Sequence, residues 1–307
     1  MSPAMAQVNG PGPSPATDFN NVINLPEDQA NFPGGDFAVI SGIDGETIQL
    51  NINEGGTIGD DSEAQIGAEV NVSGGSLGSR FMARSGSEVN ISSGTVGISF
   101  QALGGSLVTI SGGTISDSLE VNAGSEVNIS GGTLRDIVAR GSMNISGGNI
   151  ERLFQANSGS VITVSGGSID AIAASGGSQV NLIGREFFVD GQELDTLVPG
   201  EAFTVTDRDG SITGLLADGQ PFSFRLDTGF SVDGNFSSNA TLTVTLDASV
   251  LLGDVNRDGL VNFLDIAPFI GILSAGGVQA EADINQDGVV NFLDIAPFIG
   301  VLTTAAS

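Results

Sequence analysis

Five residue types are absent from this sequence: cysteine, histidine, lysine, tryptophan and tyrosine. Without cysteine the chain has no disulfide framework, so its stability must come from packed structure and bound ions. Without histidine, cysteine, lysine or tyrosine, the side chains that remain for catalysis are carboxylates, serine and arginine. Tryptophan and tyrosine are the flat platforms that sugar-binding clefts usually offer, and this chain has neither.

Positive charge is also scarce. The nine basic residues are all arginine, and they stand against 36 acidic residues in a chain of 307, which gives a formal charge of −27. Nucleic acids and anionic membranes would repel such a chain, so neither is expected as a partner. No apolar run approaches the roughly 18 residues that a membrane span requires. The composition fits a secreted acidic protein that collects divalent cations.

The first forty residues are rich in proline, glycine and asparagine. We interpret residues 1–40 as a flexible lead and an N-terminal cap. Ala4-Met5-Ala6 has the small-x-small form of a signal-peptide cleavage site, but the charged and apolar regions that precede such a site are not present. Either a signal peptide is truncated or cleaved near Ala6, or the match is chance. A secreted, extracellular or cell-surface location is expected.

Residues 41–183 repeat a short β pattern, as in Glu69-Val70-Asn71-Val72-Ser73-Gly74-Gly75. The apolar residues that end the repeated cores lie 16 to 20 residues apart: Ile52, Val72, Ile91, Ile110, Ile129, Ile145, Val164 and Leu182. A period of this kind, with glycine corners and three apolar patches per repeat, is typical of a solenoid. The sequence predicts a mainly β fold, a parallel β-helix of eight coils stacked about 4.8 Å apart.

Alternation within each core places one polar residue on the outside between two buried apolar residues. Stacking would align these outer residues into a ladder: Asn51, Asn71, Asn90, Thr109, Asn128, Asn144, Thr163 and Asn181. The ladder is explained by hydrogen bonds between the side chains of neighbouring coils. A flat polar face for a glycan or for ice is the alternative.

Residues 184–249 lose the period and read as ordinary strands joined by turns. Phe203–Thr206, Phe222–Leu226 and Leu242–Leu246 alternate apolar and polar side chains, and Asp218-Gly219 supplies a turn. We interpret this segment as a β-strand cap domain over the open end of the solenoid.

Residues 250–307 contain one calcium-loop pattern twice. Each copy places oxygen side chains at loop positions 1, 3, 5, 9 and 12 and a glycine at position 6, which suits a hard cation that takes six to eight oxygen ligands. Position 7 contributes a backbone carbonyl, so its side chain is free to be apolar. The candidate ligands for two Ca²⁺ ions are Asp254, Asn256, Asp258, Leu260, Asn262 and Asp265, then Asp283, Asn285, Asp287, Val289, Asn291 and Asp294.

The aspartate at position 12, the valine at position 8 and the tandem duplication make residues 250–303 resemble a type I dockerin. The resemblance implies a small α-helical, calcium-dependent module that binds a cohesin domain on a scaffold or cell surface. It also implies that partner specificity lies at loop positions 10 and 11, which are Phe263-Leu264 and Phe292-Leu293 here. Because the two halves are identical at these positions, the module could bind in either of two orientations.

This chain departs from the family pattern after position 12, where family helices usually continue with lysine or arginine. Here Pro268 and Pro297 follow, and proline inside a helix removes a hydrogen bond and kinks or shortens it. Apolar pairs come next, Phe269-Ile270 and Phe298-Ile299. Their surface either packs within the module or faces a hydrophobic partner.

Many parallel β-helices act on polysaccharides, so an enzyme has to be considered. Glycoside hydrolysis needs two carboxyl groups that face one bond, and the acids on the coils show no such pairing. Arg135, Arg140 and Arg152 are expected on neighbouring coils near Asp136 and Glu151, which favours surface ion pairs over a lyase site. We find no active site, and we expect a calcium-binding attachment protein. A dockerin-bearing protein that degrades or binds polysaccharide remains the alternative.

Overall fold

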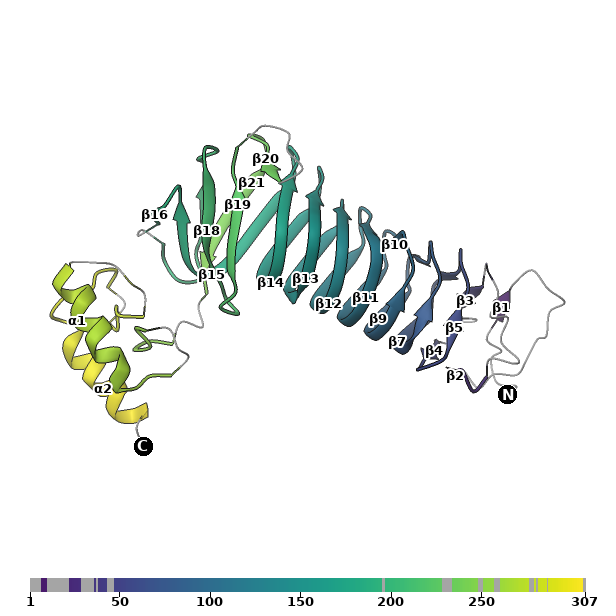
Figure 1. Cartoon of the computed structure of the whole chain (residues 1–307), viewed down its shortest axis with the longest axis horizontal. Helices are drawn as coiled ribbons and strands as arrows, with labels where there is room; N and C mark the ends of the chain where they lie inside the picture. The colour runs from purple at the N-terminus through teal and green to yellow at the C-terminus, as the bar shows by residue number, and fades with distance from the viewer. Residues whose placement is uncertain are drawn as a thin grey trace.

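The computed structural model describes residues 7–9, 22–28, 36, 38–42, 47–194, 197–227, 234–247, 251–256, 260–275, 279, 281–285 and 287–305. Ala4 and Ala6, in the expected cleavage site, and Asp258, the fifth residue of the first loop, lie outside these residues. The described strands stack along one long axis, and two helices lie beyond the end of the stack (Figure 1).

The elements up to the last coil begin with short strands and end with long ones. They are β1 (Gln7–Asn9), β2 (Val22–Leu25), β3 (Val39–Ser41), β4 (Ile48–Ile52), β5 (Thr57–Ile58), β6 (Glu63–Ala64), β7 (Ala68–Leu77), β8 (Met82–Ala83), β9 (Glu88–Val96), β10 (Phe100–Ala102), β11 (Leu107–Val121), β12 (Glu126–Ala139), β13 (Ser142–Ala156) and β14 (Val161–Ala174). The remaining elements are β15 (Gln179–Val189), β16 (Gln192–Glu193), β17 (Ala202–Val205), β18 (Ser211–Leu216), β19 (Pro221–Arg225), β20 (Asn235–Phe236), β21 (Thr241–Leu246), the 3₁₀ helix η1 (Phe263–Asp265), α1 (Ile266–Ala275) and α2 (Ile295–Ala305).

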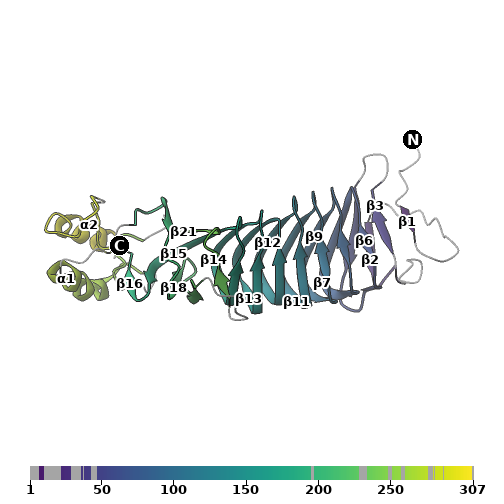
Figure 2. The same cartoon turned by 90° about the horizontal axis from the view of Figure 1, so that it is seen from above.

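The predicted β-helix is confirmed: β4 to β14 form a parallel β-solenoid of about seven turns. Each coil pairs in register with the next, so that Val72 lies beside Ile91, which in turn lies beside Ile110. These side chains are buried in one continuous core that runs the length of the stack. Figure 2 shows the stacked coils from above. The second corner glycine takes the turn: at Gly132 φ is +86°, and a Cβ there would lie 2.9 Å from the Gly112 carbonyl oxygen.

The predicted outer ladder is held by amide-to-amide hydrogen bonds. Each Nδ2 group donates to the asparagine Oδ1 of the preceding coil, from Asn51 to Asn24, from Asn71 to Asn51, from Asn90 to Asn71 and from Asn144 to Asn128, over 2.8 to 3.1 Å. Asn71 also donates to Oε1 of Glu69 at 2.8 Å. The amide groups are therefore used within the ladder, as the structural interpretation predicts.

At both ends the solenoid includes strands that lie outside the repeated part of the sequence. At the N-terminal end β2 pairs with β4 and β3 with β6, both in parallel. At the other end β21 pairs in parallel with β15, with Asn181 beside Thr243. The eighth predicted core, in β15, does not complete a coil, because from Gly184 to Val189 the same strand pairs antiparallel with β18.

Between β15 and β21 the chain makes the expected hairpin strands. β18 and β19 are antiparallel around the Asp218-Gly219 turn. The Asp218 carboxylate accepts a hydrogen bond at 2.7 Å from the N–H of Gly167, at the glycine corner of the last full coil. This hairpin therefore covers backbone that no further full coil covers, which is what a cap must do.

Candidate calcium-binding module

The second loop curls around the carboxylate of Asp283. Its Oδ1 and Oδ2 atoms accept hydrogen bonds from the backbone N–H groups of Asp287 (3.1 Å) and Gly288 (2.8 Å). Gly288 has a φ of +88°, in the left-handed region that favours glycine. Oδ1 of Asn285 accepts from the same Asp287 N–H at 2.9 Å. Loop positions 1, 3 and 5 are thus brought together, as their spacing predicts.

Asp294 closes the second loop from position 12. Its Oδ1 atom accepts from the N–H of Asn285 at 3.1 Å, and its Oδ2 atom accepts from the N–H of Asn291 at 2.9 Å. One carboxylate therefore ties loop position 3 to position 9. The side chain of Asn291 in turn accepts from the N–H of Leu293 at 2.8 Å, just before the exiting helix α2.

The first loop repeats this closure with Asp265. Its carboxylate accepts from the N–H of Asn256 at 2.9 Å and from the N–H of Asn262 at 2.8 Å. The carboxylates of Asp265 and Asp294 are fully buried, and Asp254 at position 1 is also buried. The position-7 residues, Leu260 and Val289, expose their side chains, which fits a role for the carbonyl oxygen alone.

The charge of the module favours a bound cation. Residues 250–307 contain one arginine, Arg257, against seven acids: Asp254, Asp258, Asp265, Glu281, Asp283, Asp287 and Asp294. Burial of a carboxylate is costly unless it is paired or coordinated. In the described part of the chain no group of three acidic side chains could hold a metal ion by itself. The loops also offer asparagine and backbone oxygens. That mixed oxygen donor set is the one that Ca²⁺ takes.

The two prolines do not kink the helices. Pro268 is the third residue of α1 and Pro297 is the third residue of α2. In the first turn of a helix the N–H groups have no intrahelical partner, so proline is tolerated there. Each helix begins directly after the position-12 aspartate, and this start places the proline in the first turn.

The two halves of the module share one small core. Its buried members are Val255, Phe269, Ala282, Val290, Phe298 and Leu302. The halves are also joined by the Gly253 N–H, which donates to the Glu281 carbonyl at 2.8 Å. The apolar pairs divide between the two interpretations: Phe269 and Phe298 pack inside, whereas Ile270 and Ile299 are exposed. The sequence left both interpretations open for each whole pair, whereas adjacent residues of a helix point in different directions, so that one is buried and the other exposed.

The residues expected to contact a partner lie on the surface. Phe263 and Phe292 are 73% and 80% exposed, and Leu264 and Leu293 are each 67% exposed. Large apolar side chains that are exposed to this extent are typical of a surface that contacts another protein.

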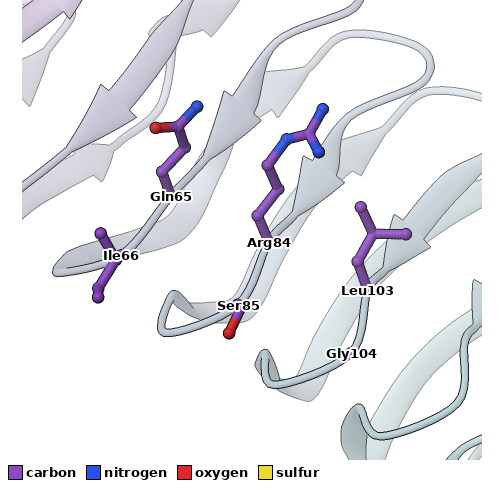
Figure 3. Close-up of a pocket in the computed structure, with 6 residues that line it drawn as sticks. All are labelled: Gln65, Ile66, Arg84, Ser85, Leu103 and Gly104. Carbon is purple, nitrogen blue, oxygen red and sulfur yellow. The ribbon is translucent and has the colours of Figure 1, made fainter.

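The solenoid surface carries ion pairs and one shallow hollow. Arg152 pairs with Asp136 at 3.1 Å, as expected. Arg135 lies 4.0 Å from Asp117, an acid that the sequence analysis did not name as its partner. The hollow, of about 390 Å³, lies where the strands β6, β8 and β10 of three successive coils end (Figure 3). It is lined by Gln65, Ile66, Arg84, Ser85, Leu103 and Gly104.

Comparison with known proteins identifies the C-terminal module. Residues 252–302 match the family model of the dockerin type I domain, which confirms the resemblance seen in the sequence. Type I dockerins bind calcium. The match supports a cohesin-binding attachment module on this β-helix protein. Neither the curated proteins nor the solved structures contain a significant match to this chain. Among the described residues, no helix has the length and apolarity needed to cross a membrane.

Proposed function

We propose that this chain is an exported structural protein whose dockerin module tethers a β-helix rod to a cohesin-like protein or a cell-surface scaffold. The observation that carries the proposal is the pair of identical loop closures, by Asp265 and by Asp294, in a segment that matches the dockerin family. The outer location follows from the attachment role and from the need for calcium concentrations that fill such loops.

Two calcium ions are proposed, one for each loop. The oxygens of Asp254, Asn256, Asp258, Asn262 and Asp265, with the Leu260 carbonyl, would hold the first ion. The oxygens of Asp283, Asn285, Asp287, Asn291 and Asp294, with the Val289 carbonyl, would hold the second. The bound ions supply positive charge that offsets the repulsion among the carboxylates, so that the free energy of binding contributes to folding.

Partner capture is assigned to Phe263, Leu264, Phe292 and Leu293. Their exposure supports contact with an apolar patch of the partner. Because the second pair repeats the first, either half can face the partner, and one half is expected to be sufficient for capture.

The test is capture of a purified cohesin domain by the full chain, with calcium and with chelator. The variant Asp254→Ala plus Asp283→Ala should lose capture, while the thermal unfolding of the β-solenoid stays unchanged. Calorimetry on the unmodified chain should give two calcium ions per chain. Calcium-independent capture, or capture by the double variant, would contradict the proposal.

A second function, binding of a polysaccharide by the rod, has one observation in its favour. The hollow beside Arg84 combines the apolar side chains Ile66 and Leu103 with the polar Gln65 (Figure 3). Arg84 pairs there with Glu63, so the site is close to neutral and suits sugar hydroxyl groups. Binding of neutral oligosaccharides that is lost on Arg84→Ala would support this function, whereas unchanged binding would place it elsewhere.

A further inference from the structure

One corner of the β-solenoid is interrupted in a single coil. At this corner most coils turn through four residues, such as residues 122–125 between β11 and β12 and residues 157–160 between β13 and β14. Between β12 and β13 the turn consists of Arg140 and Gly141 alone. The strands on both sides of this turn stay paired with their neighbours in register. The turn therefore stops short of the ridge that the other turns form along the rod.

The short turn also breaks a chain of hydrogen bonds along this ridge. In the regular turns a glycine N–H donates to the glycine carbonyl of the next turn over 2.7 to 3.0 Å, from Gly67 to Gly86, from Gly86 to Gly105, from Gly105 to Gly124 and from Gly159 to Gly177. At the interruption, the Gly124 N–H has no acceptor and the Gly159 carbonyl has no donor among the described residues. One donor and one acceptor are thus left on opposite sides of the short turn.

Open space lies between these two groups. Gly105 and Gly159 share a left-handed backbone, with φ values of +84° and +87°. A Cβ built on Gly105 would lie 2.5 Å from the turn of the preceding coil, whereas a Cβ built on Gly159 would meet no atom within 4 Å. We name this space the corner gap. Its walls are the turns of Gly124 and Gly159, and its floor is the short turn of Arg140 and Gly141.

Two side chains at the corner gap have no partner within the described part of the chain. In a regular turn the buried serine donates to a carbonyl of its own turn, as Ser125 does to Asn122 at 2.6 Å. The hydroxyl of Ser160 is fully buried and makes no hydrogen bond. Arg140 is exposed, and its guanidinium makes neither an ion pair nor a hydrogen bond. Since buried polar groups in folded proteins normally have partners, the gap retains unused hydrogen-bonding capacity.

We propose that the corner gap binds the acetamido group of an N-acetylated sugar. Neighbouring coils lie about 4.8 Å apart, so the two walls are separated by about two such steps. A trans secondary amide stacks at this same spacing between a donor and an acceptor, as peptide groups do in stacked strands. Its carbonyl oxygen accepts from the Gly124 N–H, and its own N–H donates to the Gly159 carbonyl. The guanidinium of Arg140 donates to the hydroxyl oxygens of the sugar.

The walls of the gap favour a sugar over a peptide. Their exposed residues are small: Ala123, Gly124, Ser158 and Gly159. Peptide recognition at a sheet uses pockets for alternate side chains, and walls of this size offer none. A neutral ligand is favoured because the chain, with its charge of −27, repels anions. The gap shares no residue with the calcium loops or with the hollow beside Arg84, so its function does not depend on theirs.

Calorimetry on the calcium-saturated full chain tests the proposal with two trimers of the same linkage, one of N-acetylglucosamine and one of glucose. The acetylated trimer should bind at least about tenfold more tightly, because only this trimer offers the amide. It should also slow hydrogen exchange at the amide of Gly124. Equal binding of the two trimers, or binding of neither, would show that the proposal is wrong.

A variant that closes the gap is the sharpest test of the location. In it residues 140–141 are replaced by the four-residue sequence of residues 122–125, which restores the regular turn. The variant should unfold at no lower temperature than the unmodified chain, and its affinity for the acetylated trimer should fall at least about tenfold. Retention of the affinity would overturn the proposal.

Arg140→Gln leaves the backbone of the gap unchanged and decides the question even if the longer turn misfolds. Its affinity for the acetylated trimer should fall about threefold to tenfold. The matched control is Arg135→Gln, an exposed change on the same rod, which should keep the affinity. An N-acetylated glycine tripeptide offers the amide without a sugar. If this peptide binds as tightly as the acetylated trimer and Arg140→Gln has no effect, the ligand is a peptide and the sugar assignment is wrong.

Discussion

Phe269 and Phe298 stack face to face in the dockerin module, with ring centroids 4.0 Å apart and ring planes at 11°. Each is the fourth residue of its helix, so the contact joins equivalent residues of the two halves. Such self-complementary contact is the geometry of a twofold interface, here within one chain. Both rings are almost fully buried, and they form the centre of a core with few other large side chains.

Substitution of Phe269 by alanine should therefore unfold the module and leave the rod intact. Removal of a buried phenylalanine typically costs about 3–5 kcal/mol, which a core of this size cannot absorb. Circular dichroism should lose the helical signal while the solenoid transition keeps its midpoint. Phe269→Leu, which retains most of the apolar volume, should keep the helices. Two intact helices in the alanine variant would mean that the stack is dispensable.

The position-12 aspartates should control calcium one loop at a time. Asp294→Asn keeps the shape of the side chain and removes its charge, so calorimetry should find one tight calcium ion instead of two. Asp265→Asn should give the same result through the other loop. Asp170→Asn, an exposed change on the rod, is the matched control and should leave both binding events unchanged. Retention of two equal sites in Asp294→Asn would exclude the assigned closure.

The asparagine ladder should tolerate threonine and reject aspartate. The amide of Asn71 donates to Asn51 and to Glu69, so Asn71→Asp places a carboxylate against two acceptors. A cost of about 2 kcal/mol is expected in urea unfolding. Asn71→Thr should cost less than about 1 kcal/mol, because threonine already occupies this row at Thr109 and Thr163. Equal stability of both variants would show that the ladder contributes no hydrogen-bond energy.

The ion pair between Asp61 and Arg80 should make part of the rod's stability depend on pH. The hydrogen bond from Arg80 holds the pKa of Asp61 below the ordinary value of 3.8. A carboxyl group with a lowered pKa in the folded state stabilises the fold above pH 3.8, and this contribution is lost as the pH falls further.

Asp61→Asn tests this dependence without disturbing the backbone. Asp61 has a φ of +57°, a conformation that asparagine tolerates. The variant should have a lower urea midpoint than the unmodified chain at pH 7 and low salt, and the two midpoints should converge as the pH falls below 3.8. A difference that persists at pH 2 would assign the effect to geometry rather than charge.

The sequence by itself determined the features that repeat. The solenoid follows from apolar residues every 16 to 20 positions, since each coil buries its core only against the next. The two loops proposed to bind calcium follow from oxygen side chains at fixed spacing within one short segment, and hydrogen bonds bring Asp283, Asn285 and Asp287 together. In both cases the interaction depends on residues near one another in the chain or at a constant period.

Tertiary structure decided what depends on contacts far apart in the chain. Thr243 joins the outer ladder beside Asn181, although the 62-residue separation conceals the period. Phe269 and Ile270 are equally apolar, and only the packing of α1 against α2 buries the first and exposes the second. The apolar character of a residue in the sequence does not tell whether its own chain, a partner or solvent faces its side chain.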